Sequence, residues 1–561
     1  MRSSVNDELE EQTTRSSQGA AVLAVLSAAM FVYVIDTTLM NVSISALVED
    51  LNTTVGQVQA AITLYTLTMA SFMLTGGKLG DIWGSKRAFR IGLIIYGIGT
   101  TITAFAPTIG FVMFGWSILE GLGSALIVPA INTLVRANYK GSKRASAYGL
   151  LFGVAAAGAA FGPLIGGWVT TYMSWRVAFG AEALIVLGVL LASGLIVDAP
   201  AVIPTPKLDV VGVVLSVAGM GLFVFGILQT TSRGWKDPLV LSLIGLGVVL
   251  IGAFVWWVRK MEREGRPALL HPSIFRHRSS SAGLPILSTQ TFAQAGLLFL
   301  IPLFTQSMLG FDALQTGVTL LPLSIGVLLT STLTPSLGQR IYPKYIIQAG
   351  LVLLFIGGFI LAGSLEDATQ ASDMALGLLI GGLAIGLIAG QLPNLILSGV
   401  DANEASEASG LQGTAQNLGM ALGTAVIGTV ILSVAIASIG DRVADSEIVP
   451  DSMKSQIQSA LEDGINSADA ESVENEIDAA PAEVQDELGT IYNDAAIDGF
   501  QGAILVGGLV ALLGALLAFR LPKQKLPGDG GVEQAVRETV RSPTIPAMQL
   551  EMDDLPKSQS P

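Results

Sequence analysis

Three acidic residues, Asp36, Glu120 and Glu182, interrupt long apolar stretches of this 561-residue sequence. A charged side chain at the centre of a lipid bilayer costs at least about 2.5–3.5 kcal/mol on insertion scales, so such a carboxylate must face protein or a water-filled cavity. Removal from water also favours the neutral form of the acid, which prepares it to exchange protons. The three residues are therefore candidates for proton exchange and for contact with a substrate.

Each of these acids also has a structural interpretation. A tilted first span would bring Asp36 to the outer headgroups, where a carboxylate is tolerated. Glu120 could be a protonated side chain that is hydrogen-bonded to a neighbouring helix. For Glu182 the structural interpretation is the favoured one, with Arg176 as a candidate ion-pair partner.

Further polar residues within apolar stretches are candidates for lining a substrate cavity. The alternative is that they form interhelical hydrogen bonds, each worth about 0.6 kcal/mol. These residues are Asn41, Gln290, Gln294, Gln391 and Asn394.

Several kinds of chemistry are excluded or unsupported. The sequence has no cysteine, which excludes thiolate metal sites, and its two histidines lie in one basic loop. We find no catalytic or metal-binding pattern and no G-x-x-x-x-G-K-[ST] phosphate loop. The sequence therefore predicts a protein that is not an enzyme, holds no metal or cofactor, and is not an ATP-driven pump of the P-loop kind.

The composition places the chain in a membrane. It is 51% hydrophobic and only 13% charged, with a mean hydropathy of +0.62. About fourteen segments are long and apolar enough to span a bilayer as helices, so we expect an all-α polytopic membrane protein. Lys and Arg crowd alternate loops, and the positive-inside rule then puts both termini in the cytoplasm.

The net charge of −14 has a local origin. Between Asp441 and Asp498 there are 16 acids and 2 bases, while the rest of the chain carries 28 of each. This acidic loop is expected to be a solvated extracytoplasmic excursion with short amphipathic helices near 457–461 and 473–477. We do not expect nucleic-acid binding, because it needs a basic surface.

A charged segment between the second span (55–77) and the third (90–106) reads Gly-Lys-Leu-Gly-Asp-Ile-Trp-Gly-Ser-Lys-Arg, in which glycines permit a tight turn. The segment resembles the signature loop of the major facilitator superfamily, although Ile82 stands where that family usually has Arg or Lys. The resemblance implies a cytoplasmic gate formed by Gly77, Gly80, Asp81, Gly84, Lys86 and Arg87.

The fifth span contains a pattern similar to the G-x-x-x-G-P-x-x-G-G motif of antiporters in this superfamily. Three glycines spaced four residues apart leave a flat groove on one helix face, and the proline removes a backbone donor. The alternative is that the groove merely packs helices. The residues of the motif are Gly158, Gly162, Pro163, Gly166 and Gly167.

Other elements resemble the fourteen-span drug:proton antiporters of that superfamily. Asp36 to Val42 is similar to their D-x-T-x-x-N-V element in the first span. The fourth span is similar to their R-x-x-Q-G-x-G-x-A pattern, but Ser117 replaces the arginine and Glu120 replaces the glutamine. That arginine is thought to assist proton transfer in relatives, and Glu120 is a candidate substitute.

The resemblance, which runs from the first span to the thirteenth, implies a major facilitator fold with 14 transmembrane helices. Two six-helix bundles (19–197 and 282–521) would flank a connector (198–281) with two inserted helices near 210–230 and 239–258. A cytoplasmic tail (1–18), the acidic outer loop (440–498) and a disordered cytoplasmic tail (522–561) complete the expected organisation.

The function implied is proton-coupled export of hydrophobic or cationic drug-like compounds by alternating access, performed by a monomer in a prokaryotic plasma membrane. Two alternatives remain open. One is uptake or export of a specific metabolite or lipid by the same fold. The other is a non-transporting receptor that uses the acidic loop, for which deletion of 445–494 would abolish function.

Overall fold

The computed structural model describes residues 2–139, 141–198, 208–398, 400, 405–463 and 480–524. Within these ranges the chain is helical and contains no strand, which confirms the all-α expectation. Thirteen of the described helices are long and apolar enough to cross a membrane. Helix α4 (Ser85–Ala104) corresponds to the remaining expected span and begins with the cations Lys86, Arg87 and Arg90.

The N-terminal half consists of α1 to α8, and the C-terminal half consists of α12 to α21. The helices of the N-terminal half are α1 (Arg2–Val42), α2 (Ile44–Asp50), α3 (Val55–Trp83), α4, α5 (Ile109–Val112), the π-helical segment η1 (Met113–Glu120), α6 (Gly121–Asn138), α7 (Gly141–Tyr172) and α8 (Trp175–Ala192). Those of the C-terminal half are α12 (Arg278–Ser307), α13 (Ala313–Thr319), α14 (Leu321–Arg340), α15 (Pro343–Ser364), α16 (Ala375–Ala389), α17 (Leu392–Leu397), α18 (Ala405–Asp445), α19 (Asp451–Asp463) and α21 (Ala482–Leu517).

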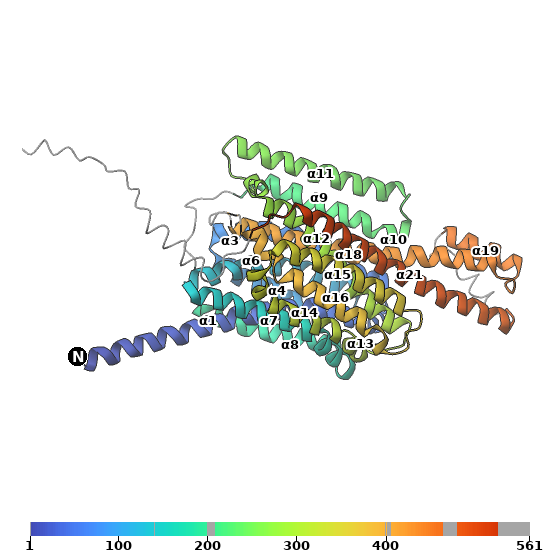
Figure 1. Cartoon of the computed structure of the whole chain (residues 1–561), viewed down its shortest axis with the longest axis horizontal. Helices are drawn as coiled ribbons and strands as arrows, with labels where there is room; N and C mark the ends of the chain where they lie inside the picture. Colours follow the sequence, from blue (N-terminus) through green and yellow to red (C-terminus); the bar gives the residue numbers. More distant parts are fainter. Residues whose placement is uncertain are drawn as a thin grey trace, which may run out of the picture.

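Two further long helices, α9 (Val210–Leu228) and α11 (Pro238–Arg263), join the halves and match the two inserted helices that we expected. They lie side by side along one flank of the molecule, with α11 outermost (Figure 1). Most residues of α11 are exposed in the isolated chain, and its apolar surface is suited to contact with lipid.

The turn between α3 and α4 is much shorter than the charged loop predicted from the sequence. Gly77 and Gly80 lie inside α3, and Gly84 alone separates the two helices. Its φ angle of 90° belongs to a region that favours glycine, and a Cβ there would meet Asp198 Oδ2 at 2.9 Å. The expected tight turn is confirmed, but the expected span bounds of 77 and 90 were wrong, because both helices continue until Gly84 alone makes the reversal.

The two halves meet along α3 and α18. Gln59 on α3 donates from Nε2 to the Thr424 carbonyl on α18 at 2.9 Å. At another point of the seam, Lys78 Nζ lies 2.7 Å from Glu407 Oε1. Helix α7 also crosses between the halves, because a Cβ at Gly167 would meet the backbone of Ala313 on α13.

The described part of the acidic loop is more helical than expected. Helix α18 continues to Asp445, and with α19 and the first turns of α21 it forms a helical cap at the opposite end of the molecule from the N-terminus (Figure 1). The cap has a small apolar core that includes Val443, Met453 and Ile491. The helix expected at 457–461 lies within α19, whereas 473–477 and the tail beyond 524 lie outside the described residues.

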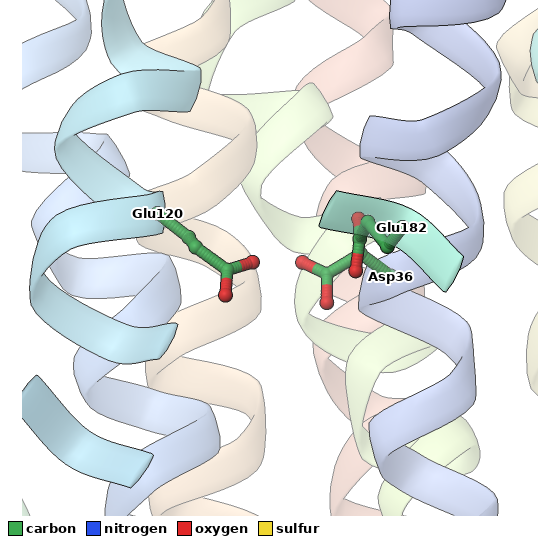
Figure 2. Close-up of side chains that lie close together, drawn as sticks. All are labelled: Asp36, Glu120 and Glu182. Atoms are coloured by element: carbon green, nitrogen blue, oxygen red, sulfur yellow. The ribbon is translucent and has the colours of Figure 1, made fainter. Parts of the chain in front are cut away.

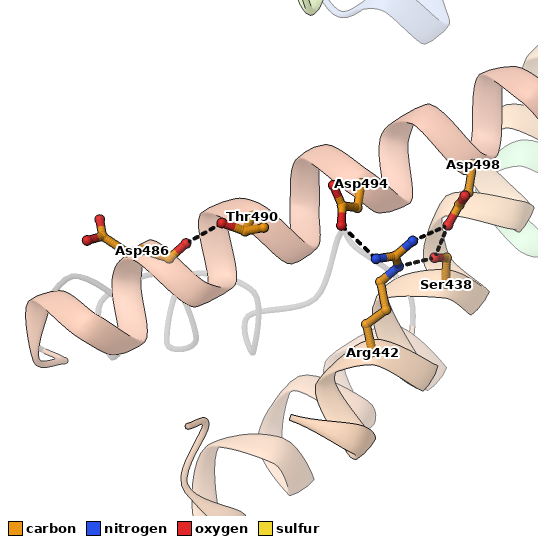
Figure 3. Close-up of polar contacts among 6 residues, drawn as sticks. All are labelled: Ser438, Arg442, Asp486, Thr490, Asp494 and Asp498. Carbon is orange, nitrogen blue, oxygen red and sulfur yellow. Dashed lines mark hydrogen bonds and ion pairs between the residues drawn. The ribbon is translucent and has the colours of Figure 1, made fainter. Parts of the chain in front are cut away.

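An arginine joins the two long helices of the cap at its base. Arg442 on α18 donates to Asp494 Oδ2 at 2.7 Å and to Asp498 Oδ2 at 3.0 Å, both on α21 (Figure 3). Ser438 donates to the same oxygen of Asp498 at 2.7 Å. These contacts hold the extensions of α18 and α21 together beyond the bundle.

Candidate functional site

The fold brings the three intramembrane acids together inside the N-terminal half. Asp36 comes from α1, Glu120 from the end of η1 and Glu182 from α8, and Figure 2 shows their carboxylates converging. One oxygen of each lies within 4.8 Å of the others. Their exposed fractions are 1%, 0% and 7%, so they form a buried cluster, which we call the carboxylate triad. Asp36 is therefore enclosed by protein rather than open to its surroundings.

Asp36 is oriented by an indole. Trp116 Nε1 donates to Asp36 Oδ1 at 2.8 Å and to Oδ2 at 3.0 Å. The Trp116 ring stacks on Tyr65 of α3, with centroids 4.6 Å apart and planes within 2°. The stacked pair fixes the indole and thereby the direction from which the Asp36 carboxylate receives its hydrogen bonds.

Glu182 is held by helix α4 rather than by an ion pair. The Tyr96 hydroxyl donates to Glu182 Oε1 at 2.5 Å, and Thr100 Oγ1 lies 3.4 Å from Oε2. Arg176, the partner suggested by the sequence, instead forms an ion pair with Asp50 and donates to the Ala106 carbonyl at 2.8 Å. The Arg176–Glu182 pair was wrong because Arg176 lies at the very start of α8 and reaches away from the triad.

Glu120 has the least support of the three. Thr103 Oγ1 donates to Glu120 Oε1 at 3.4 Å, while Oε2 is buried and has no hydrogen-bond partner in the described structure. Its position follows from close packing of η1 on α4, where a Cβ at Gly99 would lie 2.8 Å from Glu120 Cγ. Glu120 also ends the π-helical segment, and such segments occur frequently at functional sites.

No cation neutralises the triad among the residues that the structure describes. Ser117, at the place of the antiporter arginine, donates to the Ala61 carbonyl at 2.8 Å, and none of the ion pairs in those residues involves a triad acid. Like charges this close in a low-dielectric interior cannot all be ionised. The site must therefore hold protons or a cation.

The other polar candidates are not gathered around the triad. Asn41 donates to the Thr37 carbonyl on its own helix at 2.8 Å. Gln290 donates to Gln294 at 2.7 Å, and Gln391 donates to the Thr334 carbonyl at 2.7 Å. Asn394 is exposed. The hydrogen bond from Gln391 on the α16–α17 break to α14 agrees with the interhelical alternative.

Within the charged segment, the residue that bridges the two halves is one that the sequence analysis did not assign to the gate. Lys78 pairs with Glu407, and both are buried, with exposed fractions of 5% and 7%. His271, in the connector between α11 and α12, places its backbone N–H 3.1 Å and its Nδ1 2.7 Å from Glu407 Oε2. The pairing joins positions far apart in sequence, so the only available signal was a lysine inside the motif.

The predicted gate residues Lys86 and Arg87 lie elsewhere in this conformation. Lys86 Nζ donates to the Ile196 carbonyl at 2.6 Å, and its backbone N–H donates to Asp198, so it binds the segment that follows α8 in its own half. Arg87 is exposed.

The glycine motif of α7 packs in two directions. Cβ atoms at Gly158, Gly162 and Gly166 would meet α1, whereas one at Gly167 would meet α13 of the other half. On α13, a Cβ at Gly317 would meet the Pro163 carbonyl carbon at 3.0 Å. The groove therefore brings α7 close to the helix that carries Asp36 and also to the opposite half.

Comparison with known proteins identifies this fold. The family model described as Major Facilitator Superfamily matches residues 26–424. The chain belongs to the major facilitator superfamily. It is a multi-pass membrane transporter and not an enzyme, and the resemblance to the drug-efflux members of the superfamily is confirmed.

Two relatives illustrate the similarity within the major facilitator superfamily. The chain is 28% identical to the "Probable actinorhodin transporter" of Streptomyces coelicolor, over 91% of this chain and 93% of the relative. It is 29% identical to the "Puromycin resistance protein pur8" of Streptomyces alboniger, over 75% of this chain and 83% of the relative. A solved bacterial homologue of the human lysosomal transporter Spinster, in an inward-facing conformation, has a TM-score of 0.57 at 13% identity and covers 90% of this chain and 98% of that one.

Proposed function

We propose that this transporter exports hydrophobic or cationic drug-like compounds in exchange for protons. One observation carries the proposal. The half that contains the antiporter glycine motif also contains three buried carboxylates, and no cation among the described residues pairs with them. The names of the relatives, which refer to export and to antibiotic resistance, support the direction of transport.

The proposed cycle uses the triad as the store of exchangeable protons. External protons neutralise Asp36 or Glu120, and the neutral site lets the carrier turn inward because no unpaired charge is then buried. Inside, the substrate binds as a proton leaves. A proton that enters down an inside-negative potential contributes about 2.3 kcal/mol per 100 mV.

The substrate class follows from the charge of the site. Acids in an apolar environment attract lipophilic cations, and the stacked pair of Tyr65 and Trp116 beside Asp36 adds aromatic surface. We place both termini in the cytoplasm and the acidic cap outside a bacterial plasma membrane, with a monomer as the working unit. Transport of a specific metabolite or lipid by the same cycle is the second candidate.

Efflux of a cationic dye from energised cells tests the proposal. Wild-type protein should lower dye retention in a manner abolished by dissipating the proton gradient. The Asp36→Asn and Glu120→Gln variants replace an ionisable acid by a neutral side chain of similar size, so we expect at least one of them to lose this efflux.

A matched control removes an acid outside the membrane. Glu487 in the cap accepts a hydrogen bond from Ser446 at 3.0 Å, and Glu487→Gln should leave efflux unchanged. Gradient-dependent efflux that persists in both triad variants would exclude exchange on these carboxylates. If wild type moves no dye, cationic dyes are excluded as the substrate class and metabolites become the next substrates to test.

A further inference from the structure

The carboxylate triad has the donor set of an inorganic cation site. Its three side chains supply only oxygen ligands, which suit hard cations such as Na⁺, Mg²⁺ and Ca²⁺ rather than soft metals. The three nearest oxygens lie within 4.8 Å of one another, so a single ion at their centre can touch all three. The sequence analysis expected no metal site because the three acids are far apart along the chain.

A second observation points to a missing ligand. Glu120 is completely buried, and its Oε2 atom, which accepts no hydrogen bond, belongs to a carboxylate directed toward Asp36 and Glu182 (Figure 2). A buried acceptor without a partner costs about 1–3 kcal/mol, and more if it is charged. An ion bound between the acids would satisfy this oxygen.

The surroundings of the triad discriminate between hard cations. Calcium takes six to eight oxygen ligands, and magnesium requires octahedral geometry and retains several waters. Among the described residues that contact the triad, the Trp116 indole can only donate, whereas the hydroxyl oxygens of Tyr96, Thr100 and Thr103 can also act as ligands. In a buried site, a monovalent ion can replace a single proton without changing the net charge, whereas a divalent ion would have to displace two protons, so Na⁺ fits best.

We infer that Asp36, Glu120 and Glu182 bind one Na⁺ ion, which occupies the site in place of a proton. The inference deepens the proposed function, because it names a second ion for the same carboxylates. When Na⁺ enters and one carboxylic acid releases its proton, the charge of the site is unchanged, so either ion can accompany the same conformational step. Glu182 then becomes an ion ligand rather than a structural residue.

Binding of radioactive sodium to the purified full-length protein in lipid nanodiscs tests this inference without any transport step. At alkaline pH, with choline as the background cation, we expect saturable binding of one Na⁺ per chain. The Glu120→Gln and Glu182→Gln variants should bind sodium about tenfold more weakly or not at all, a loss of about 1.4 kcal/mol or more. The Glu487→Gln control should bind like wild type.

A stability measurement guards against misfolded variants. The amide oxygen of Glu182→Gln can still accept from Tyr96, so this variant should fold. Sodium should raise the thermal unfolding temperature of wild type but not that of this variant, because a ligand stabilises only the state that binds it.

Absence of saturable sodium binding in wild type, or binding that is unchanged in both glutamate variants, would overturn the inference. Gradient-driven efflux in sodium-free buffer separates this result from the proposed function. Efflux without sodium binding would mean that the triad binds protons but not sodium. Sodium binding without efflux would support the ion site and contradict the proposed proton-coupled export.

Discussion

At the scale of single residues, the three acids of the triad differ in how firmly their surroundings hold them. Asp36 accepts two hydrogen bonds from one indole, and Glu182 accepts hydrogen bonds from a phenol and a hydroxyl. Glu120 accepts one long hydrogen bond. Because hydrogen bonds to a carboxylate stabilise its charged form, the three positions are chemically distinct. Variants of the supporting residues should therefore affect exchange without removing an acid.

Trp116→Phe removes the N–H that contacts both oxygens of Asp36 and keeps an aromatic ring to stack on Tyr65. A hydrogen bond to a charged group is worth about 1.5–3 kcal/mol, so we expect proton-driven efflux to fall about tenfold or more. Trp256→Phe, at an exposed position of α11, should have no effect. Equal dye-efflux rates in the two variants would show that the indole does not support Asp36 in transport.

Gly99→Ala should disturb the close packing of α4 against η1 that positions Glu120. The added Cβ would lie 2.5 Å from the Gly115 carbonyl oxygen and 2.8 Å from Glu120 Cγ, so α4 and η1 must separate. Overpacking of this kind costs about 1–3 kcal/mol, and the thermal unfolding temperature of the purified protein should fall. Gly180→Ala has open space around it and should be neutral. Equal unfolding temperatures would mean that the contact yields without strain.

The sequence was sufficient to select the acids but not to assemble them. Asp36 and Glu120 stand out because charge is costly inside a span, and that signal is local. Their convergence with Glu182 depends on the rotation and packing of three separate helices, which hydropathy does not encode. For the same reason the sequence assigned Arg176 to the wrong partner.

At the scale of elements, contacts between α3 and α18 and between α7 and α13 join the two halves. Lys78 and Glu407 form a buried ion pair with His271 as a third member. Removing one partner of a buried pair typically costs about 3–5 kcal/mol, because the remaining charge is left uncompensated. A seam that opens during transport must break and remake this pair.

Lys78→Met should open the seam between α3 and α18. The sequence has no cysteine, so a Ser409→Cys probe can be labelled without background; Ser409 lies across the seam, 3.4 Å from Asn132. We expect the probe to react with a thiol reagent at least about tenfold faster when Lys78 is replaced. Arg266→Met, which breaks an exposed pair with Glu264, is the control. Unchanged labelling in Lys78→Met would show that the pair does not close the seam.

Helix positions followed well from hydropathy, and helix ends did not. The inserted helices were predicted within a few residues, since about 20 apolar residues leave little choice in a membrane. The tight turn between α3 and α4 was expected, but the ends of the two helices were misplaced because glycines and charges suggested an earlier end, whereas of the three glycines only Gly84 has a positive φ angle.

At the scale of the whole molecule, the acidic cap is the part that lies outside the transport fold. Its two long helices are joined by Arg442 and by an apolar core, and it stands at the far end from the N-terminus (Figures 1 and 3). The sequence analysis expected a solvated loop with short amphipathic helices, and the stretch 457–461 does contribute to this core, but the packing of that stretch against α18 and α21 could not be read from the sequence.

Deletion of 445–494 separates a transporter with an appended cap from a receptor. We expect the deletion variant to insert in the membrane and to retain most of its efflux, because the triad and the seam lie in the bundle. Cell-surface abundance and dye efflux should be measured on the same cells. Absence of efflux from wild type and deletion variant alike would favour the non-transporting receptor, whereas loss of efflux in the deletion variant alone, at normal abundance, would show that transport needs the cap.

The most direct test of the central claim is proton movement coupled to substrate in liposomes that contain only this protein and a trapped pH indicator. With no imposed gradient, a lipophilic cation added on one side should drive protons in the opposite direction through wild type. The same addition should produce no signal through Asp36→Asn combined with Glu120→Gln. An equal proton signal from that double variant, or substrate movement without protons in wild type, would contradict the account.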